Sequence, residues 1–146
     1  MSIRIFAEDK GPPAYIRAAL DVLGAERIDH GVRCLEDPDL VTRLAKERVP
    51  LTVCPLSNVK LCVFPNLAHH PLKALLDAAL CATVNSDDPA YFGGYIDRNF
   101  VSTFTALPLD ARDAYNLARN SFTASFVDEG SKRDWIETLD TAFAAA

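Results

Sequence analysis

The chain has 146 residues, of which 49% are hydrophobic and 24% are charged, and its formal net charge at pH 7 is -5. This length suffices for a buried core, and we expect residues 1–146 to form a single domain. The acidic balance disfavours binding to nucleic acid or to an anionic membrane by charge, and no hydrophobic run approaches the roughly 18 residues that span a bilayer.

Short hydrophobic runs alternate with segments of helical periodicity over the first part of the chain. The proline-containing stretch 55–70 between two of them is rich in turn residues and is predicted to be a loop. Strands that are separated by helices pair in parallel, so this order predicts an α/β fold with a parallel sheet. The predicted strands cover residues 3–6, 26–30, 51–54 and 81–84, and the predicted helices cover residues 14–23, 36–48 and 71–80.

The rest of the chain is predicted to be helical, over residues 95–105, 109–124 and 131–143. Asp110 and Ser131 are the expected N-caps of the last two helices. The four cysteines form no C-x-x-C pattern, and the start of the sequence shows no secretion signal. We therefore expect a cytoplasmic protein whose cysteines are reduced, mostly buried thiols.

Polar residues that can carry chemistry follow each of the four predicted strands. Parallel strands place their carboxyl ends at one edge of a sheet, where α/β proteins and (β/α) barrels hold their active sites. Four such sets together predict a functional site at that edge. In chain order they are Glu8-Asp9, Asp29-His30, Ser57-Asn58 and Asp87-Asp88.

Each of these residues also has a purely structural interpretation. His30 is of a residue type that changes charge near neutral pH, but a histidine at a strand end is often only a hydrogen-bonded surface residue. Asp87 and Asp88 point to different sides, so one can bind a metal and the other a ligand, although they also suit a turn or a helix N-cap. A solvated loop is favoured for Asp9, and a loop or the start of a helix for His69-His70.

Three motifs occur in order along the chain: Glu26–Gly31 (ERIDHG), Cys54–Asn58 (CPLSN) and Asn85–Pro89 (NSDDP). The matching pattern continues through YFGGY at 91–95, NF at 99–100 and NSF at 120–122. With this order and spacing, the chain resembles the adenosine and adenine deaminases of the metal-dependent amidohydrolase superfamily. The segments 61–64 and 91–95 look more like the adenine deaminase branch.

The resemblance implies an eight-stranded (β/α) barrel in which zinc activates a water. The resulting hydroxide attacks the purine carbon that bears the amino group, and ammonia leaves. The resemblance also implies that Asp87 ligates the zinc, Asp88 hydrogen-bonds the purine ring and His30 orients the attacking hydroxide. Ser57 and Asn58 are further candidates for substrate binding.

The chain departs from the family pattern at residues that concern the metal. It has three histidines and no His-x-His motif, which supplies two zinc ligands in the family. Phe6 stands where the family has a third histidine ligand, and Asp9 stands where it has the glutamate that protonates the purine ring. Because catalytic zinc needs about three protein ligands, we expect that this chain alone does not retain zinc.

The predicted strands match the last four of the barrel, so the resemblance implies a partial TIM-type barrel, the carboxyl-terminal half of a deaminase. A half barrel leaves sheet edges unpaired, which favours a homo-oligomer or association with a missing amino-terminal half. Three hypotheses follow: an enzyme part that is inactive alone, a non-catalytic module that dimerises or binds a full-length deaminase, and a deaminase assembled from two chains. The purine partner of a completed site, base or nucleoside, stays open.

Overall fold

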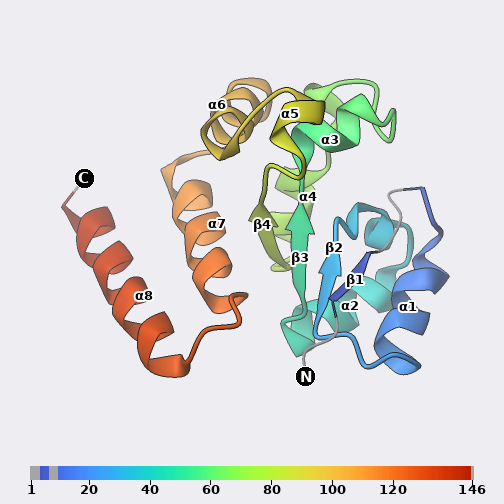
Figure 1. Cartoon of the computed structure of the whole chain (residues 1–146), viewed down its shortest axis with the longest axis horizontal. Helices are drawn as coiled ribbons and strands as arrows, with labels where there is room; N and C mark the ends of the chain where they lie inside the picture. Colours follow the sequence, from blue (N-terminus) through green and yellow to red (C-terminus); the bar gives the residue numbers. More distant parts are fainter. Residues whose placement is uncertain (1–3, 7–9, 146) are drawn as a thin grey trace.

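The computed structural model describes residues 4–6 and 10–145 (Figure 1). The strands are β1 (Arg4–Phe6), β2 (Arg27–Asp29), β3 (Pro50–Val53) and β4 (Cys81–Val84). The α-helices are α1 (Pro13–Asp21), α2 (Pro38–Glu47), α3 (Pro55–Lys60), α4 (Leu72–Asp77), α5 (Pro89–Phe92), α6 (Ile96–Ala106), α7 (Ala111–Thr123) and α8 (Glu129–Ala144). Two short 3₁₀ helices are η1 (Val32–Glu36) and η2 (Leu67–His69).

The strands form one sheet in the order β1-β2-β3-β4, and every neighbouring pair is parallel. The predicted α/β fold with a parallel sheet is therefore confirmed. Helices α3, α5 and α6 lie beyond the carboxyl end of β3, whereas α7 packs against β4 (Figure 1). Within the described part of the chain, β1 and β4 each pair with one other strand only, and Asn120 of α7 donates a hydrogen bond to the Ala82 carbonyl oxygen of β4 at 2.9 Å.

The hydrophobic core lies between the sheet and the helices that cover it. Ile28 of β2 and Leu51 of β3 are fully buried, and they belong to one cluster with Leu44 of α2, Leu72 of α4 and Leu117 of α7. Removing these side chains from water supplies the main favourable free energy for holding the helices on the sheet. The positions of the strand ends, and thus of the residues that follow them, are fixed by this packing.

The prediction of a loop over the whole stretch 55–70 is wrong. The stretch contains α3 and η2, and α3 begins at Pro55 because proline, which has no backbone N–H, is well tolerated in the first turn of a helix. Helix α3 therefore begins two residues after the end of β3. Ser57 and Asn58, in its first turns, lie at the carboxyl end of the sheet. Helix α4 is also shorter than predicted, and Ala79 after it has a left-handed backbone conformation.

The caps of the last two helices were predicted with mixed success. Asp110 caps α7 as expected: its side chain accepts a hydrogen bond from the Asp113 backbone N–H, and Asp113 Oδ2 accepts one from the Asp110 backbone N–H. The prediction of Ser131 for α8 is wrong, because Asp128 Oδ1 accepts a hydrogen bond from the Ser131 backbone N–H at 3.0 Å. The helix thus begins two residues before Ser131.

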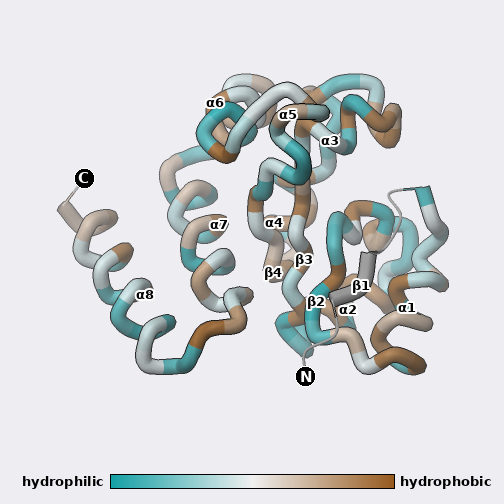
Figure 2. The backbone as a smooth tube through the Cα atoms, viewed as in Figure 1, coloured by the Kyte–Doolittle hydropathy of each residue, from teal (hydrophilic) through white to brown (hydrophobic). Residues whose placement is uncertain are grey.

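Helix α8 lies at the edge of the molecule and packs on α7, and none of its described residues is buried (Figure 1). The segment that joins these two helices is hydrophobic, and Phe126 and Val127 within it are exposed (Figure 2). The Arg27 guanidinium lies 4.5 Å from the centre of the Phe126 ring. None of the described helices is both long enough and apolar enough to cross a membrane.

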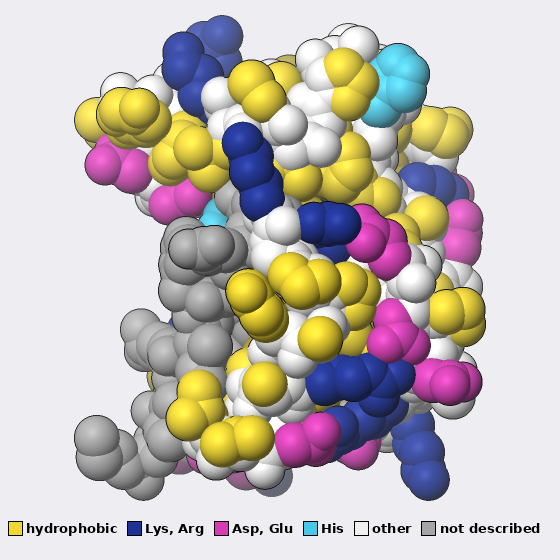
Figure 3. Space-filling view, turned by 90° about the vertical axis from the view of Figure 1, so that its right-hand side faces the viewer, with side chains coloured by type: hydrophobic (Ala, Val, Ile, Leu, Met, Phe, Trp, Pro, Cys, Tyr) yellow, Lys and Arg dark blue, Asp and Glu magenta, His cyan; other side chains and the backbone are white. Residues whose placement is uncertain are grey.

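The face that carries α1 mixes basic, acidic and hydrophobic side chains without a continuous basic patch (Figure 3). Ion pairs join Arg17 to Asp37 at 2.8 Å and Arg43 to Asp21 at 2.7 Å in this part of the fold. The four cysteines form no disulfide among the described residues. Burial raises the pKa of the Cys34 thiol to about 12, so this thiol is unreactive at neutral pH.

Candidate functional site

The structure brings His30, Ser57, Asn58 and Asp87 together at the carboxyl ends of β2, β3 and β4. His30 follows β2, Ser57 and Asn58 lie in α3 directly after β3, and Asp87 follows β4. Asp87 Oδ2 accepts a hydrogen bond from Ser57 Oγ at 2.7 Å and lies 3.8 Å from His30 Nε2. Asp9 lies outside the described residues, so its place in this site stays a prediction.

The backbone is left-handed at the two central residues of the cluster. His30 has φ 57° and Asp87 has φ 56°, values that cost non-glycine residues free energy and that occur often at functional sites. Gly31 has φ 67°, and a Cβ built on it would lie 2.8 Å from Leu51 Cδ2. Glycine is therefore required there, both for the turn that follows β2 and for close packing on β3.

Three potential ligand residues of different chemistry lie close together in the cluster. The ligand atoms of His30, Cys54 and Asp87 all lie within 4.8 Å of one another. Nitrogen, sulfur and carboxylate oxygen are the ligand types that zinc takes in proteins. Cys54 was not a candidate from the sequence, although its place between β3 and Pro55 put it at the same sheet edge. His30 is buried, whereas 27% of the Asp87 side chain is exposed.

Asp88 adopts the structural role that the sequence offered as an alternative. Its Oδ1 accepts hydrogen bonds from the backbone N–H groups of Ala90 and Tyr91, at 3.1 and 3.0 Å, and so caps the short helix α5. Its side chain is exposed beside the cluster rather than buried in it. Asp88 as a purine contact remains a prediction.

Ser57 and Asn58 are fully buried, and their polar atoms bond to protein groups. Asn58 Nδ2 lies 3.2 Å from His30 Nδ1, and Asn58 Oδ1 lies 3.1 Å from His70 Nε2. The Leu72 backbone N–H donates to His70 Nδ1 at 3.2 Å. His70, which the sequence favoured as part of a loop without function, is therefore buried behind the cluster and connected to it.

The neighbouring histidine, His69, differs from His70 in its exposure and in its hydrogen-bond partner. His69 is exposed and bonds through Nδ1 to Asn66 Oδ1 at 2.8 Å. Of the two adjacent histidines, only His70 reaches Asn58, because η2 turns the chain between them. The one signal in the sequence that His70 begins a buried segment is its place directly before Pro71 and a hydrophobic helix. This pattern does not predict that His70 is connected to His30.

Acidification is expected to destabilise the fold through His70. Burial lowers the pKa of His70 from 6.5 to about 4. Between these two pH values the His70 ring is protonated in the unfolded chain but not in the folded chain. Stability is therefore lost as the pH falls from 6.5 towards 4, by about 3 kcal/mol in all at 1.36 kcal/mol per pKa unit.

Urea unfolding of the chain and of His70→Gln across this pH range measures the effect, as the difference between the two pH slopes. His69→Gln is the matched control, and its slope is expected to equal that of the unmodified chain. Equal slopes for the unmodified chain and His70→Gln would contradict the assignment.

Asn99 joins the loop above the site to α3. Its Oδ1 accepts a hydrogen bond from the Leu56 backbone N–H at 3.2 Å, and its Nδ2 donates to the carbonyl oxygens of Gly94 and Tyr95. The side chain is fully buried, so the start of α6 is anchored to the turn that carries Ser57. The sequence indicated this residue only as part of a family motif.

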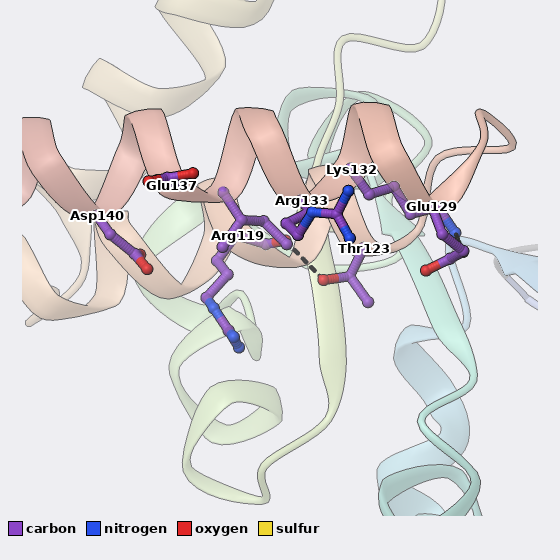
Figure 4. A pocket seen from close by; sticks show the side chains of 8 residues that line it. Arg119, Thr123, Glu129, Lys132, Arg133, Glu137 and Asp140 are labelled. Carbon is purple, nitrogen blue, oxygen red and sulfur yellow. Dashed lines mark hydrogen bonds and ion pairs between the residues drawn. The ribbon is translucent and has the colours of Figure 1, made fainter.

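A cavity of about 660 Å³ lies elsewhere, between α7 and α8 (Figure 4). Its lining mixes basic and acidic side chains, and none of the residues of the strand-end cluster reaches it. We therefore place the candidate site at the strand ends and not in this cavity. The lining residues are Arg119, Thr123, Glu129, Lys132, Arg133, Ile136, Glu137 and Asp140.

Comparison with protein families gives one match, to the model described as adenosine deaminase, over residues 1–142. The adenine deaminases of Geotalea uraniireducens and Trichlorobacter lovleyi are each 62% identical to the chain over 138 residues, which is 94% of this chain but 39% and 40% of those proteins. The chain thus spans about two fifths of the length of the curated relatives it matches.

Solved structures agree with the sequence comparison. The crystal structure of adenine deaminase from Arthrobacter aurescens matches with a TM-score of 0.95 and 47% identity, over 100% of this chain and 44% of that one. A zinc-bound amidohydrolase from Burkhoderia ambifaria matches with a TM-score of 0.85 and 23% identity, over 100% of this chain and 43% of that one, which shows a shared fold. The predicted relation to the amidohydrolase type of TIM barrel is thereby confirmed for part of a barrel.

Proposed function

Because this chain belongs to the adenosine deaminase family, we propose that it forms the carboxyl-terminal half of a zinc-dependent adenine deaminase barrel. The reaction is the hydrolytic replacement of the purine 6-amino group by oxygen, in which one water is consumed and one ammonia is released. The observation that carries the proposal is the cluster of His30, Ser57 and Asp87 at the strand ends. Adenine is favoured over adenosine because the curated relatives are adenine deaminases.

Asp87 fits zinc, because a carboxylate oxygen is a ligand that zinc takes in proteins, and it is the residue that would hold the metal. The ligand atoms of His30 and Cys54 lie within 4.8 Å of it and of each other, but we propose that neither belongs to the ligand set. When bound, zinc lowers the pKa of a water and so supplies the nucleophile at neutral pH. The chain has no histidine apart from His30, His69 and His70. We therefore propose that the remaining ligands come from the amino-terminal part of a completed barrel.

Ser57 and His30 act on Asp87 and on the attacking water. The Ser57 hydroxyl donates to Asp87 Oδ2 at 2.7 Å, which fixes the orientation of the carboxylate. His30 Nε2 lies beside the same oxygen, from where the imidazole would hydrogen-bond the water as it attacks. Because His30 is buried, this interaction is shielded from bulk solvent and is stronger than in water.

Two further acids would act on the purine ring. Asp88 would hydrogen-bond a ring nitrogen while it caps α5 through Oδ1. Asp9 would deliver the proton that the ring nitrogen gains as the water attacks, in place of the longer glutamate of the family. Ser57 and Asn58, predicted from the sequence as substrate contacts, are assigned instead to positioning Asp87 and His30, since both are fully buried.

A second candidate function is that of a non-catalytic module that pairs with itself or with a deaminase. The edge strands β1 and β4 favour it, because a strand that pairs on one side only can associate with another strand. In this case the chain forms a homo-oligomer, or a complex with an amino-terminal half, without any need for Asp87. Light scattering on the purified chain distinguishes a 16.0 kDa monomer from these assemblies.

Zinc content tests the proposal that this chain supplies one zinc ligand and that an amino-terminal part of the barrel supplies the others. The isolated chain, desalted after incubation with zinc, is expected to hold less than about a tenth of an equivalent, because one carboxylate ligand is too few. A chimera in which residues 10–142 replace the matching segment of a curated adenine deaminase relative is expected to hold about one equivalent. Mass spectrometry of the metal in both proteins measures this, and a full equivalent in the isolated chain would contradict the proposal.

A further inference from the structure

A continuous series of buried polar atoms runs from the start of α4 to His30. It begins at the Leu72 backbone N–H, passes through both ring nitrogens of His70 and the amide of Asn58, and reaches His30 Nδ1. The three contacts measure 3.2, 3.1 and 3.2 Å in that order. The residues His70, Asn58 and His30 are 3%, 0% and 2% exposed, so solvent does not interrupt the series.

The direction of every hydrogen bond in this series follows from its first member. A backbone N–H can only donate, so His70 Nδ1 must accept and the single proton of a neutral His70 lies on Nε2. His70 Nε2–H then donates to an oxygen, which orients the Asn58 amide with Oδ1 towards His70. The Asn58 Nδ2–H consequently donates to His30 Nδ1, which must accept.

Burial keeps the first histidine neutral, as this direction requires. The pKa of His70 is lowered to about 4 because the ring is desolvated. A protonated His70 would carry hydrogens on both nitrogens, and its Nδ1–H would oppose the Leu72 N–H. The fold thus disfavours the protonated form of His70, in which two N–H groups would face each other at Nδ1.

We propose that His70 is a positioning residue that acts through Asn58 to keep His30 Nδ1 a hydrogen-bond acceptor, so that the ring proton of His30 lies on Nε2. The proton of His30 then lies on the nitrogen that faces Asp87, so His30 approaches the site as a hydrogen-bond donor. This deepens the proposed function at the same site and rests on it for its catalytic meaning. The tautomer itself can be measured whether or not the chain takes part in deamination.

Nitrogen-15 NMR of the histidine rings in the full chain at pH 7.5 tests the proposal, because long-range proton–nitrogen correlations identify which nitrogen carries the proton. The unmodified chain is expected to show His30 and His70 both protonated on Nε2. In Asn58→Asp the carboxylate accepts from both rings, so the His30 proton is expected to move to Nδ1. In His70→Ala, Asn58 Oδ1 loses its hydrogen bond from His70 Nε2, and His30 is expected to populate both tautomers.

His69→Ala is the matched control, since it removes the adjacent exposed histidine and is expected to leave the His30 signals unchanged. A His30 proton on Nδ1 in the unmodified chain would overturn the proposal, and so would a folded His70→Ala whose His30 signals do not change. If His70→Ala fails to fold, the unmodified chain and Asn58→Asp still decide the matter. Loss of ammonia release by the chimera with an intact His30 tautomer would count against the proposed function and not against this assignment.

Discussion

Asp87→Asn in the chimera is expected to lower the rate of adenine deamination by at least about a thousandfold. The substitution keeps the size of the side chain but removes the charge of the one zinc-ligating carboxylate proposed for this chain. Without that ligand, the metal that lowers the pKa of the attacking water is lost or misplaced. The rate of ammonia release together with the zinc content of the same sample measures the effect.

A graded comparison separates this role from a general loss of structure. Ser57→Ala removes only the hydrogen bond that orients Asp87, so its expected cost is about 10- to 100-fold with the zinc retained. Asp134→Asn on α8 removes an exposed carboxylate far from the cluster and is expected to leave the rate unchanged. A rate for Asp87→Asn within a factor of about ten of the unmodified chimera would contradict the role of Asp87 as the ligand.

His30→Ala is expected to lower the rate of deamination by about 100- to 10,000-fold while the zinc content stays near that of the unmodified chimera. The imidazole is proposed to act on the attacking water and not to bind the metal, so metal content and rate are expected to change independently. Ammonia release and metal analysis on one preparation measure both quantities.

The matched control for this substitution is His69→Ala, which removes an exposed histidine bonded to Asn66. Its rate is expected to equal that of the unmodified chimera. If His30→Ala loses the zinc in proportion to the rate, His30 is a ligand and the proposed role is wrong.

The strand-end part of the site could be predicted from the sequence because it depends on local order. His30 directly follows β2 and Asp87 lies three residues after the end of β4, and parallel strands that are separated by helices must end at the same edge. Gly31 directly follows His30, and its φ of 67° and the lack of room for a Cβ beside Leu51 are conditions that favour glycine. The inference of a shared edge needs only the strand positions and no knowledge of the packing between distant segments.

His70 and Cys54 could not be assigned in the same way, because their roles depend on tertiary packing. His70 contacts Asn58 only because α3 and η2 pack against each other. The sequence predicts a loop over 55–70, so it does not show that a helix begins at Pro55. The adjacent His69 has the same residue type and the opposite environment. Residue type and spacing alone therefore cannot distinguish the two histidines, whereas burial does.

Ammonia release from adenine, measured side by side for the isolated chain and the chimera in the presence of zinc, tests the central claim most directly. The chain is proposed to supply Asp87 and His30 but not the remaining zinc ligands. The chimera is therefore expected to release one ammonia for each adenine consumed, and the isolated chain none above the protein-free control. Deamination by the isolated chain at the rate of the chimera would contradict this, as would a folded, zinc-loaded chimera that releases no ammonia.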